Sequence, residues 1–323
     1  MLGARTVRHH LLKALNIAIG VVAVVGFTVY AVSMASTVDM TRLSTPSAIV
    51  GMAIAALSSA LIIPISAFSW MHLLRSSGIE QHWGRLSIIM GMTQLGKYLP
   101  GNIAQHIGRL AMSIRAGIPT VPFATTVASE SLLAIISAVF FGALACALGG
   151  GAGLRLPLGT HDIPVVTVPV LLAASAVALG AVFMAPRIIN RIARSRFGVS
   201  SPAIPATGPL VLAFCCYVGN YLVLSIGIWA LSHLIFTVPP STWLLSGAFA
   251  LSWIVGFLLP GAPAGLGVRE TAMLAILATA EIGAEALPLI IGLRVATTAG
   301  DLLCFLVAAL AARIAPPHAS PPL

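Results

Sequence analysis

Residues 86–115 read LSIIMGMTQLGKYLPGNIAQHIGRLAMSIR, and this stretch decides how the chain folds. It is apolar overall, but Gly96, Pro100 and Gly101 interrupt it. The part before the Leu-Pro-Gly sequence, Leu86–Tyr98, has 13 residues, so as a helix it covers only about 20 Å. A membrane span needs about 20 residues to cross about 30 Å of hydrocarbon. We therefore predict two short helices around a Pro/Gly break that lies inside a membrane.

The second half of the chain repeats this pattern. The tripeptide Leu-Pro-Gly occurs at 99–101 and again at 259–261, an offset of 160 residues. An arginine follows each glycine by eight residues, Arg109 in the first copy and Arg269 in the second. The second copy lies in Thr242–Glu281, an apolar region that proline and glycine also break. The alternative is that the Leu-Pro-Gly tripeptide recurs by chance, because Leu, Pro and Gly are common in this chain.

The composition excludes a soluble globular protein. The 323 residues are 59% hydrophobic and 8% charged, whereas soluble domains carry about 25% charged residues. The formal net charge is +9, and the retention of basic residues on the cytoplasmic side of a membrane accounts for such an excess. We therefore expect no nucleic-acid partner. The four cysteines lie in apolar runs without metal-ligand spacing, so we expect no metal and no cofactor.

Six apolar runs are long enough to cross the hydrocarbon core of a bilayer. They are Ala14–Ser36, Ala48–Leu73, Pro122–Gly149, Pro164–Pro186, Pro209–Phe236 and Glu285–Arg313. The first run has 23 residues, more than the ~7–15 of the apolar h-region of a secretory signal peptide, so we predict an uncleaved helix. The expected fold class is all-α: a polytopic membrane protein with about six full spans and two re-entrant or broken-helix hairpins.

Basic residues in the loops set the orientation of such a protein. Three Lys or Arg residues precede the first run, and four arginines lie between 187 and 196. The loops assigned to the opposite side carry at most one arginine each. Both termini are therefore expected in the cytoplasm. The hairpin of 86–115 then enters from the cytoplasm, and that of 242–281 enters from outside.

These directions make the two halves inverted copies within a single membrane domain. The expected parts of residues 1–323 are a peripheral first helix (14–36), repeat A (48–149), a connector helix (164–186) and repeat B (209–313). Inverted repeats are common in transporters, which bind substrate near the midplane at broken helices. The pattern therefore favours a transporter.

The candidate substrate-binding residues flank the two breaks. They are Lys97, Tyr98, Pro100, Gly101, Asn102, Arg109, Pro260, Gly261, Arg269 and Glu270. The half-helix after each break begins with free N–H groups, which favour an anion. Lysine supplies a point charge for a phosphate, and the arginine fork suits a phosphodiester or a carboxylate. The alternatives are snorkelling for Lys97 and hairpin-anchoring ion pairs for Arg109 and Arg269, the latter beside Glu270.

Three more ionisable residues lie within predicted spans: Glu130, Arg294 and Asp301. Charges within spans usually face an interior and find partners. Arg294 and Asp301 are seven residues apart, two turns along one face, so they are predicted to pair directly or through Glu130. They line or brace a cavity as either a structural cluster or a relay. No hydrolase triad or nucleotide loop accompanies them, so we expect no enzyme.

Two motifs resemble a known family. The sequence GKYLPGN at 96–102, followed by Gly108-Arg109, is similar to the first motif of the lysylphosphatidylglycerol synthase transmembrane region. The sequence PAGLGVRE at 263–270 is similar to the second, with Ala264 where glycine is frequent. The resemblance covers nearly the whole chain.

This resemblance implies a flippase-like domain of the bacterial cytoplasmic (inner) membrane. In the multiple peptide resistance factors, such a domain moves aminoacylated phosphatidylglycerol between leaflets, and a separate soluble domain synthesises it. The 323 residues hold no such soluble domain, so we expect a lipid translocator and not a synthase.

The expected partner is a membrane lipid: an anionic or aminoacylated phospholipid, or a polyprenyl-linked head group. Two other functions stay open. One is a secondary transporter for a small anionic solute, and the other is a non-transporting partner of a glycolipid or envelope-polymer enzyme. A homo-oligomer is also left open.

Overall fold

The computed structural model describes residues 40–99, 103–151, 168–197, 205–259 and 262–314. Within these ranges the chain is helical and forms no strand. The all-α prediction is therefore confirmed. The first predicted span, Ala14–Ser36, lies outside the described residues.

Among the described residues, five helices are long and apolar enough to cross a membrane. They are α2 (Pro46–Ser76), α5 (Thr120–Leu148), α6 (Val168–Phe197), α7 (Thr207–Ile235) and α10 (Leu287–Ile314). They overlap the other five predicted spans, which confirms a polytopic membrane protein. The predicted end of the connector at Pro186 is wrong, because α6 continues through it to Phe197. Thr45 caps α2 by accepting a hydrogen bond from the Ala48 N–H, and Pro46 begins the helix, where its missing N–H costs nothing.

The two Pro/Gly-broken regions form two hairpins of short helices. The first hairpin consists of α3 (Trp83–Thr93), the 3-10 turn η2 (Gln94–Tyr98) and α4 (Ile103–Arg115). The second consists of α8 (Thr242–Leu258), η3 (Pro263–Gly265) and α9 (Val268–Ala278). The short segments η1 (Met40–Ser44) and η4 (Gly283–Ala286) precede α2 and α10. We call these units the first and the second hairpin.

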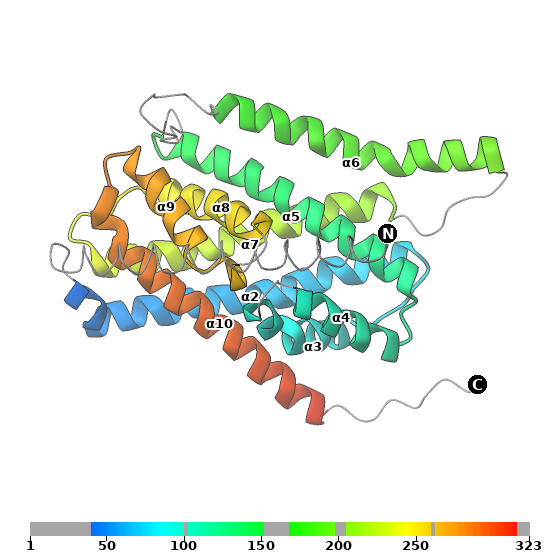
Figure 1. The fold of residues 1–323 in the computed structure, drawn as a ribbon, viewed down its shortest axis with the longest axis horizontal. Helices are drawn as coiled ribbons and strands as arrows, with labels where there is room; N and C mark the ends of the chain where they lie inside the picture. Colours follow the sequence, from blue (N-terminus) through cyan, green and yellow to red (C-terminus); the bar gives the residue numbers. More distant parts are fainter. Residues whose placement is uncertain (1–39, 100–102, 152–167, 198–204, 260–261, 315–323) are drawn as a thin grey trace, which may run out of the picture.

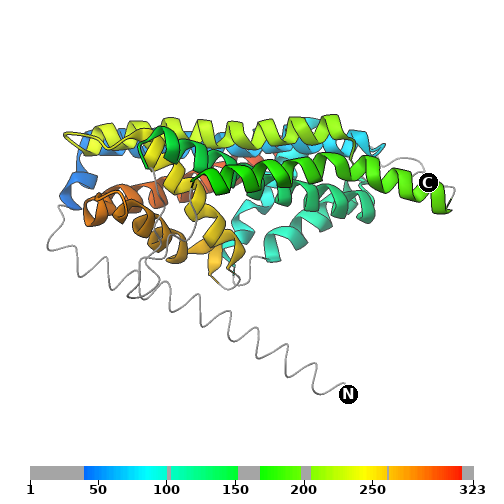
Figure 2. The ribbon, with the colours of Figure 1, turned by 90° about the horizontal axis from the view of Figure 1, so that it is seen from above.

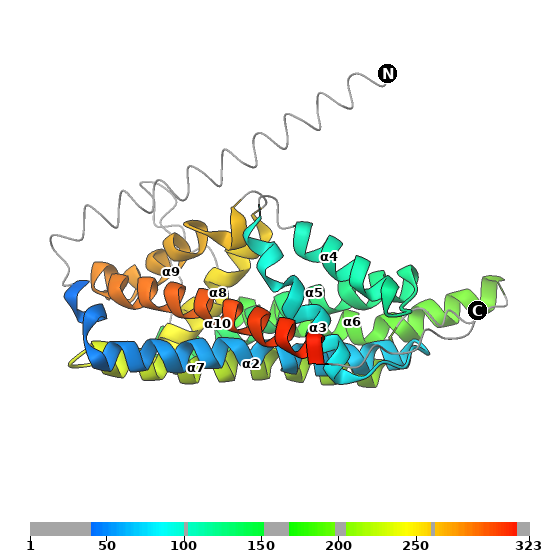
Figure 3. The same ribbon diagram turned by 90° about the horizontal axis from the view of Figure 1, so that it is seen from below.

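The hairpins lie at opposite ends of the long helices (Figures 1 and 3). The first hairpin follows the end of α2, and the second follows the opposite end of α7. The two hairpins point toward each other, so that η2 and η3 come into contact about halfway along the bundle, on the side away from α2 and α7 (Figure 3). Helices α2 and α7 form one layer, and the hairpins pack on the same side of it (Figure 2).

Small residues allow the helices to approach closely, as is usual in membranes. A Cβ on Gly227 of α7 would lie 2.6 Å from the Ala55 Cα of α2. A Cβ on Gly247 of α8 would lie 2.8 Å from the Gly142 carbonyl oxygen of α5. These glycines therefore set the spacing between the helices that carry the hairpins.

The packing partners correspond between the two halves of the chain. Helix α5 packs against α8 of the second hairpin, and α10 packs against α3 of the first, while α2 and α7 pack against each other. The order of long helix, broken hairpin and long helix is also the same in both halves. The inverted symmetry of the two units stays a prediction.

Candidate functional site

The extreme tips of the hairpins lie outside the described residues. Five candidate residues belong to these segments: Pro100, Gly101, Asn102, Pro260 and Gly261. The site is therefore built from the side chains that flank the tips and from the long helices that they meet.

The first hairpin is joined to α10 through the carboxylate of Asp301, which is 6% exposed. The Lys97 Nζ lies 2.7 Å from Asp301 Oδ2, and the Tyr98 hydroxyl donates to the same oxygen at 2.6 Å. The Gln94 amide donates to Oδ1 at 2.8 Å, and Gln105 donates to the Gln94 amide oxygen at 3.2 Å. One carboxylate on α10 thus holds three side chains of η2.

The second half of the first hairpin is joined to α5 by a buried ion pair. Arg109 Nη2 lies 2.6 Å from Glu130 Oε2, and the Tyr217 hydroxyl donates to Glu130 Oε1 at 3.1 Å. The Arg109 guanidinium also lies over the Trp70 ring, 3.7 Å from its centroid. Because Arg109 and Glu130 are only 8% and 4% exposed, this pair matches the anchoring alternative for Arg109.

The second hairpin is joined to α10 through Arg294. Its Nη1 lies 3.4 Å from Glu270 Oε1 and donates to the Ala264 carbonyl oxygen at 3.2 Å. Ala264 has a φ of 50°, in the left-handed region that glycine adopts without strain. Glycine adopts this conformation without strain, which explains why it is frequent at the position of Ala264 in the motif.

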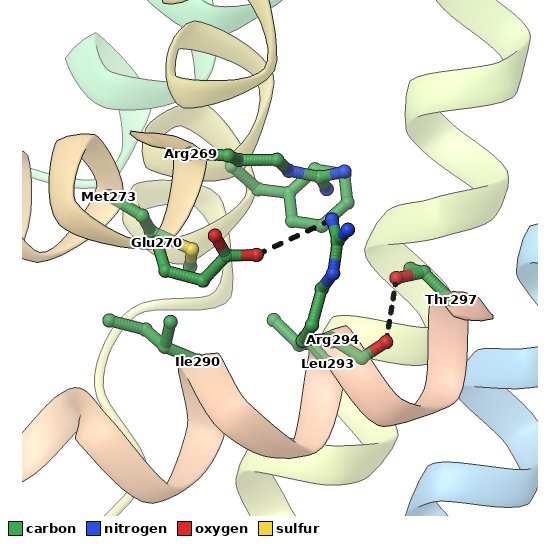
Figure 4. Close-up of a pocket in the computed structure, with 8 residues that line it drawn as sticks. Arg269, Glu270, Met273, Ile290, Leu293, Arg294 and Thr297 are labelled. Carbon is green, nitrogen blue, oxygen red and sulfur yellow. Dashed lines mark hydrogen bonds and ion pairs between the residues drawn. The ribbon is translucent and has the colours of Figure 1, made fainter. Parts of the chain in front are cut away.

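A pocket lies between the second hairpin and α10 (Figure 4). Its lining residues are Phe249, Arg269, Glu270, Met273, Ile290, Leu293, Arg294 and Thr297. Its cavity volume is about 10 Å³, far below the roughly 300–1,000 Å³ of a site that encloses a whole small molecule. In this conformation it therefore has room for no more than about one water molecule.

The pocket contains polar atoms without partners. Arg294 Nε and Nη2 and Glu270 Oε2 are buried and make no hydrogen bond to the residues that the structure describes. Arg269 lies over the Phe249 ring, 3.9 Å from its centroid, and forms no ion pair with any residue that the structure describes. Buried groups left unpaired in this way are rare, and a ligand is one explanation for them.

The predicted pairing of Arg294 with Asp301 does not occur, either directly or through Glu130. The two residues share one face of α10, but each forms its ion pair with a different hairpin: Arg294 pairs with Glu270, and Asp301 pairs with Lys97. The carboxylate of Glu130 pairs with Arg109 on the other side of the first hairpin. The three predicted charges therefore belong to three separate ion pairs.

Several residues of the site were not singled out from the sequence. They are Trp70, Gln94, Tyr217, Phe249 and Thr297. The sequence could have indicated Gln94, because it is a polar residue in an apolar run that is too short to span the membrane. The aromatic residues had none, since rings are common in membrane helices. In the described ranges no group of three or more His, Cys, Asp or Glu side chains could hold a metal ion.

The fold and these charges define a class: a multi-pass helical membrane protein with ion pairs buried around two broken hairpins. The family model of the lysylphosphatidylglycerol synthase TM region matches residues 13–304. The chain belongs to that family, as its two motifs predict. A comparison with curated proteins gave no match.

Proposed function

We propose that this protein is a flippase-like lipid translocase, which moves a phospholipid or lipid-linked head group between leaflets. The observation that carries the proposal is the pocket at the second hairpin, where buried Arg294 and Glu270 atoms lack partners beside Arg269. Ionisable residues are costly inside a membrane and commonly mark a substrate path. Membership of the family supports the same activity.

The head group would pass between the hairpins while the acyl chains stay in hydrocarbon. Besides the packing of α10 against α3 and α9, a few polar contacts join each hairpin to α10, at Asp301 for the first and at Arg294 for the second. A head group that offers its own charges to Lys97 or Arg294 would replace one of these contacts. The hairpin released in this way would open a path toward its own side of the membrane.

The remaining assignments belong to the same proposal. The protein would be a transporter and not an enzyme, and its location would be the bacterial cytoplasmic membrane with both termini in the cytoplasm. Since the sequence has no nucleotide-binding loop, lipid movement would be downhill or coupled to an ion.

A liposome assay tests the proposal. The purified protein is reconstituted with phospholipids that carry a fluorophore on an acyl chain, and an impermeant quencher is added outside. Active protein would expose the inner-leaflet lipid to quenching, so that the protected fraction falls below that of empty liposomes. Protection equal to that of empty liposomes, for anionic, zwitterionic and aminoacylated lipids alike, would contradict the proposal.

Two controls sharpen this assay. Arg294→Ala removes the contact between α10 and the second hairpin and should abolish lipid movement. Arg187→Ala, at an exposed position of α6, removes the same charge away from the hairpins and should leave movement unchanged. Uptake of a soluble anion without lipid movement would favour the solute transporter instead.

A further inference from the structure

The contact between the second hairpin and α10 is incomplete. Arg294 Nη1 lies 3.4 Å from Glu270 Oε1, whereas the ion pairs at Asp301 and Glu130 are closed at 2.7 and 2.6 Å. Both carboxylate oxygens of Asp301 and of Glu130 accept hydrogen bonds. Glu270 Oε2 accepts none from the residues that the structure describes, and Arg294 Nε and Nη2 donate none to them. The second hairpin therefore meets α10 with three polar atoms unsatisfied.

The other side chains around the cavity do not supply these partners. Four of them are apolar: Phe249, Met273, Ile290 and Leu293. The Thr297 hydroxyl donates to the Arg294 carbonyl oxygen within its own helix at 3.2 Å. The Arg269 guanidinium lies over the Phe249 ring (Figure 4). The three unsatisfied atoms therefore need a partner other than the described side chains.

The size of the cavity limits what this partner can be. Its volume is about 10 Å³, and a buried water needs roughly 10–15 Å³ and two to four polar contacts. Glu270 and Arg294 line the cavity and have three unsatisfied atoms between them. Phosphate and carboxylate groups are too large for this volume. One water molecule matches both the space and the number of contacts.

The chemistry of the three atoms distinguishes water from a small ion. Arg294 Nε and Nη2 are donors only, and Glu270 Oε2 is an acceptor only. With Arg269, the lining side chains have a net charge of +1 when they are ionised, which disfavours a metal cation. A halide ion has no proton to donate to Glu270, and the two negative charges repel each other. A water molecule accepts from Arg294 and donates to Glu270, so it satisfies both groups.

We infer that this cavity is a binding site for one water molecule, which accepts a hydrogen bond from the Arg294 guanidinium and donates one to Glu270 Oε2. The water completes the contact of the second hairpin with α10, whereas the polar contacts of the first hairpin with Asp301 are direct. This water site does not depend on lipid movement. In the proposed translocase, a head group that replaces the contact at Arg294 would displace the water.

X-ray radiolysis of the purified protein in detergent tests the site. Radiolysis converts water into hydroxyl radicals, which oxidise the nearest reactive side chains, and methionine is oxidised to its sulfoxide. Met273 lines the cavity and is 3% exposed, so bulk solvent does not reach it. Mass spectrometry of its peptide should therefore show oxidation that rises with the X-ray dose. Met273 that stays at the level of an unirradiated sample would overturn the inference.

Two variants remove the water by opposite changes. Thr297→Ile replaces a hydroxyl with a larger apolar group and fills the cavity. Glu270→Leu combined with Arg294→Leu enlarges the cavity, but Arg269 is then its one charged lining side chain, fewer than the two to four polar partners of a buried water. Both variants should lower the rate of Met273 oxidation several-fold. Thr297→Ile loses only a hydrogen bond within its own helix, so it keeps the test valid if the double variant does not fold.

Thr279→Ile is the matched control. The Thr279 hydroxyl also donates to the carbonyl oxygen three residues earlier, at Ile276, but Thr279 does not line the cavity. Met273 should be oxidised in this variant as fast as in the unchanged protein. Equal rates in Thr297→Ile and Thr279→Ile would show that no water of this cavity reaches Met273, and the inference would fail.

A change of buffer anion separates water from a halide ion. Replacing chloride with sulfate, which is too large for the cavity, should leave the rate of Met273 oxidation unchanged. A rate that rises when chloride is removed would assign the cavity to chloride and overturn the inference. Neither this result nor the results of the variants depend on whether the protein moves lipid, so they are distinguishable from a failure of the proposed function.

Discussion

The Lys97 ammonium and the Asp301 carboxylate approach within 2.7 Å, although they come from a 3-10 turn and from the last long helix of the described chain. Tyr98 and Gln94 donate to the same carboxylate. A single side chain of α10 therefore positions the end of the first hairpin. A substitution of Asp301 is therefore the most direct test of how the first hairpin is attached to α10.

Asp301→Asn should destabilise the protein and loosen the first hairpin. The change leaves Lys97 without its charged partner, and breaking a buried ion pair costs about 3–5 kcal/mol. We expect the lower end of this range, because the Lys97 side chain is 27% exposed. The measurement is denaturant unfolding of the purified protein in detergent. Lys97→Met combined with Asp301→Asn should recover part of the loss, and a double variant no more stable than Asp301→Asn would contradict the pairing.

Arg109 and Glu130 should act as a structural pair and not as a direct substrate contact. Glu130→Gln should cost about 3–5 kcal/mol, because it leaves the Arg109 charge buried and unpaired. The double variant Arg109→Met with Glu130→Met replaces both charges with apolar groups and should regain most of this stability. Lipid movement measured in that variant then decides the role: retained transport supports anchoring, and lost transport in a stable protein supports substrate binding.

Gly227→Ala should destabilise the packing of α2 against α7. The new methyl carbon would meet the Ala55 Cα at 2.6 Å, and overpacking of this kind costs about 1–3 kcal/mol. Gly219 lies on the same helix, and a methyl carbon added there would have no neighbouring atom within 4 Å. Gly219→Ala is therefore the control, and it should gain up to about 1 kcal/mol from helix propensity. Thermal unfolding midpoints of the two variants give the comparison.

Ala264→Gly should stabilise the turn of the second hairpin. The left-handed conformation at φ 50° costs an alanine about 1–2 kcal/mol, and glycine adopts it without that cost. Ala250→Gly, within the regular helix α8, should instead lose about 1 kcal/mol. Opposite shifts of the unfolding midpoint are the expected result, and destabilisation by both variants would argue against the turn geometry.

The two hairpins should be accessible from opposite sides of the membrane. Single cysteines at Glu80, between α2 and α3, and at Val238, between α7 and α8, are both at exposed positions. In a background without native cysteines, an impermeant maleimide should label Val238→Cys from outside and Glu80→Cys only after the membrane is opened. Labelling of both from the same side would contradict the inverted arrangement.

The sequence was sufficient to predict the helices but not their partners. Span length and the Pro/Gly breaks placed five long helices and both hairpins, because hydrophobic thickness and helix rise are fixed quantities. The seven-residue spacing of Arg294 and Asp301 correctly predicted that they share one face of α10. The prediction that they pair with each other was wrong. Which side chain each one meets depends on where two hairpins from distant parts of the chain come to lie.

For the candidate site, too, the sequence predicted some residues but not the contacts that they make. Arg269 and Glu270 were identified because they follow a Leu-Pro-Gly motif, and both line the pocket. The roles of Phe249 and Trp70 beneath the two arginines could not be predicted, because a stacked ring differs from a packed ring only through its tertiary neighbour. The net charge of the pocket likewise becomes visible only after the other cations are matched to their carboxylates.

The attachment of both hairpins to one helix has a consequence for the membrane as an electrical barrier. Arg294 and Asp301 are two turns apart on α10, and each forms an ion pair with one of the two hairpins. A continuous aqueous path would require both attachments to break at once, and the two penalties would then add. In the proposed translocase, releasing them one at a time would let a head group cross while ions do not leak down their gradients.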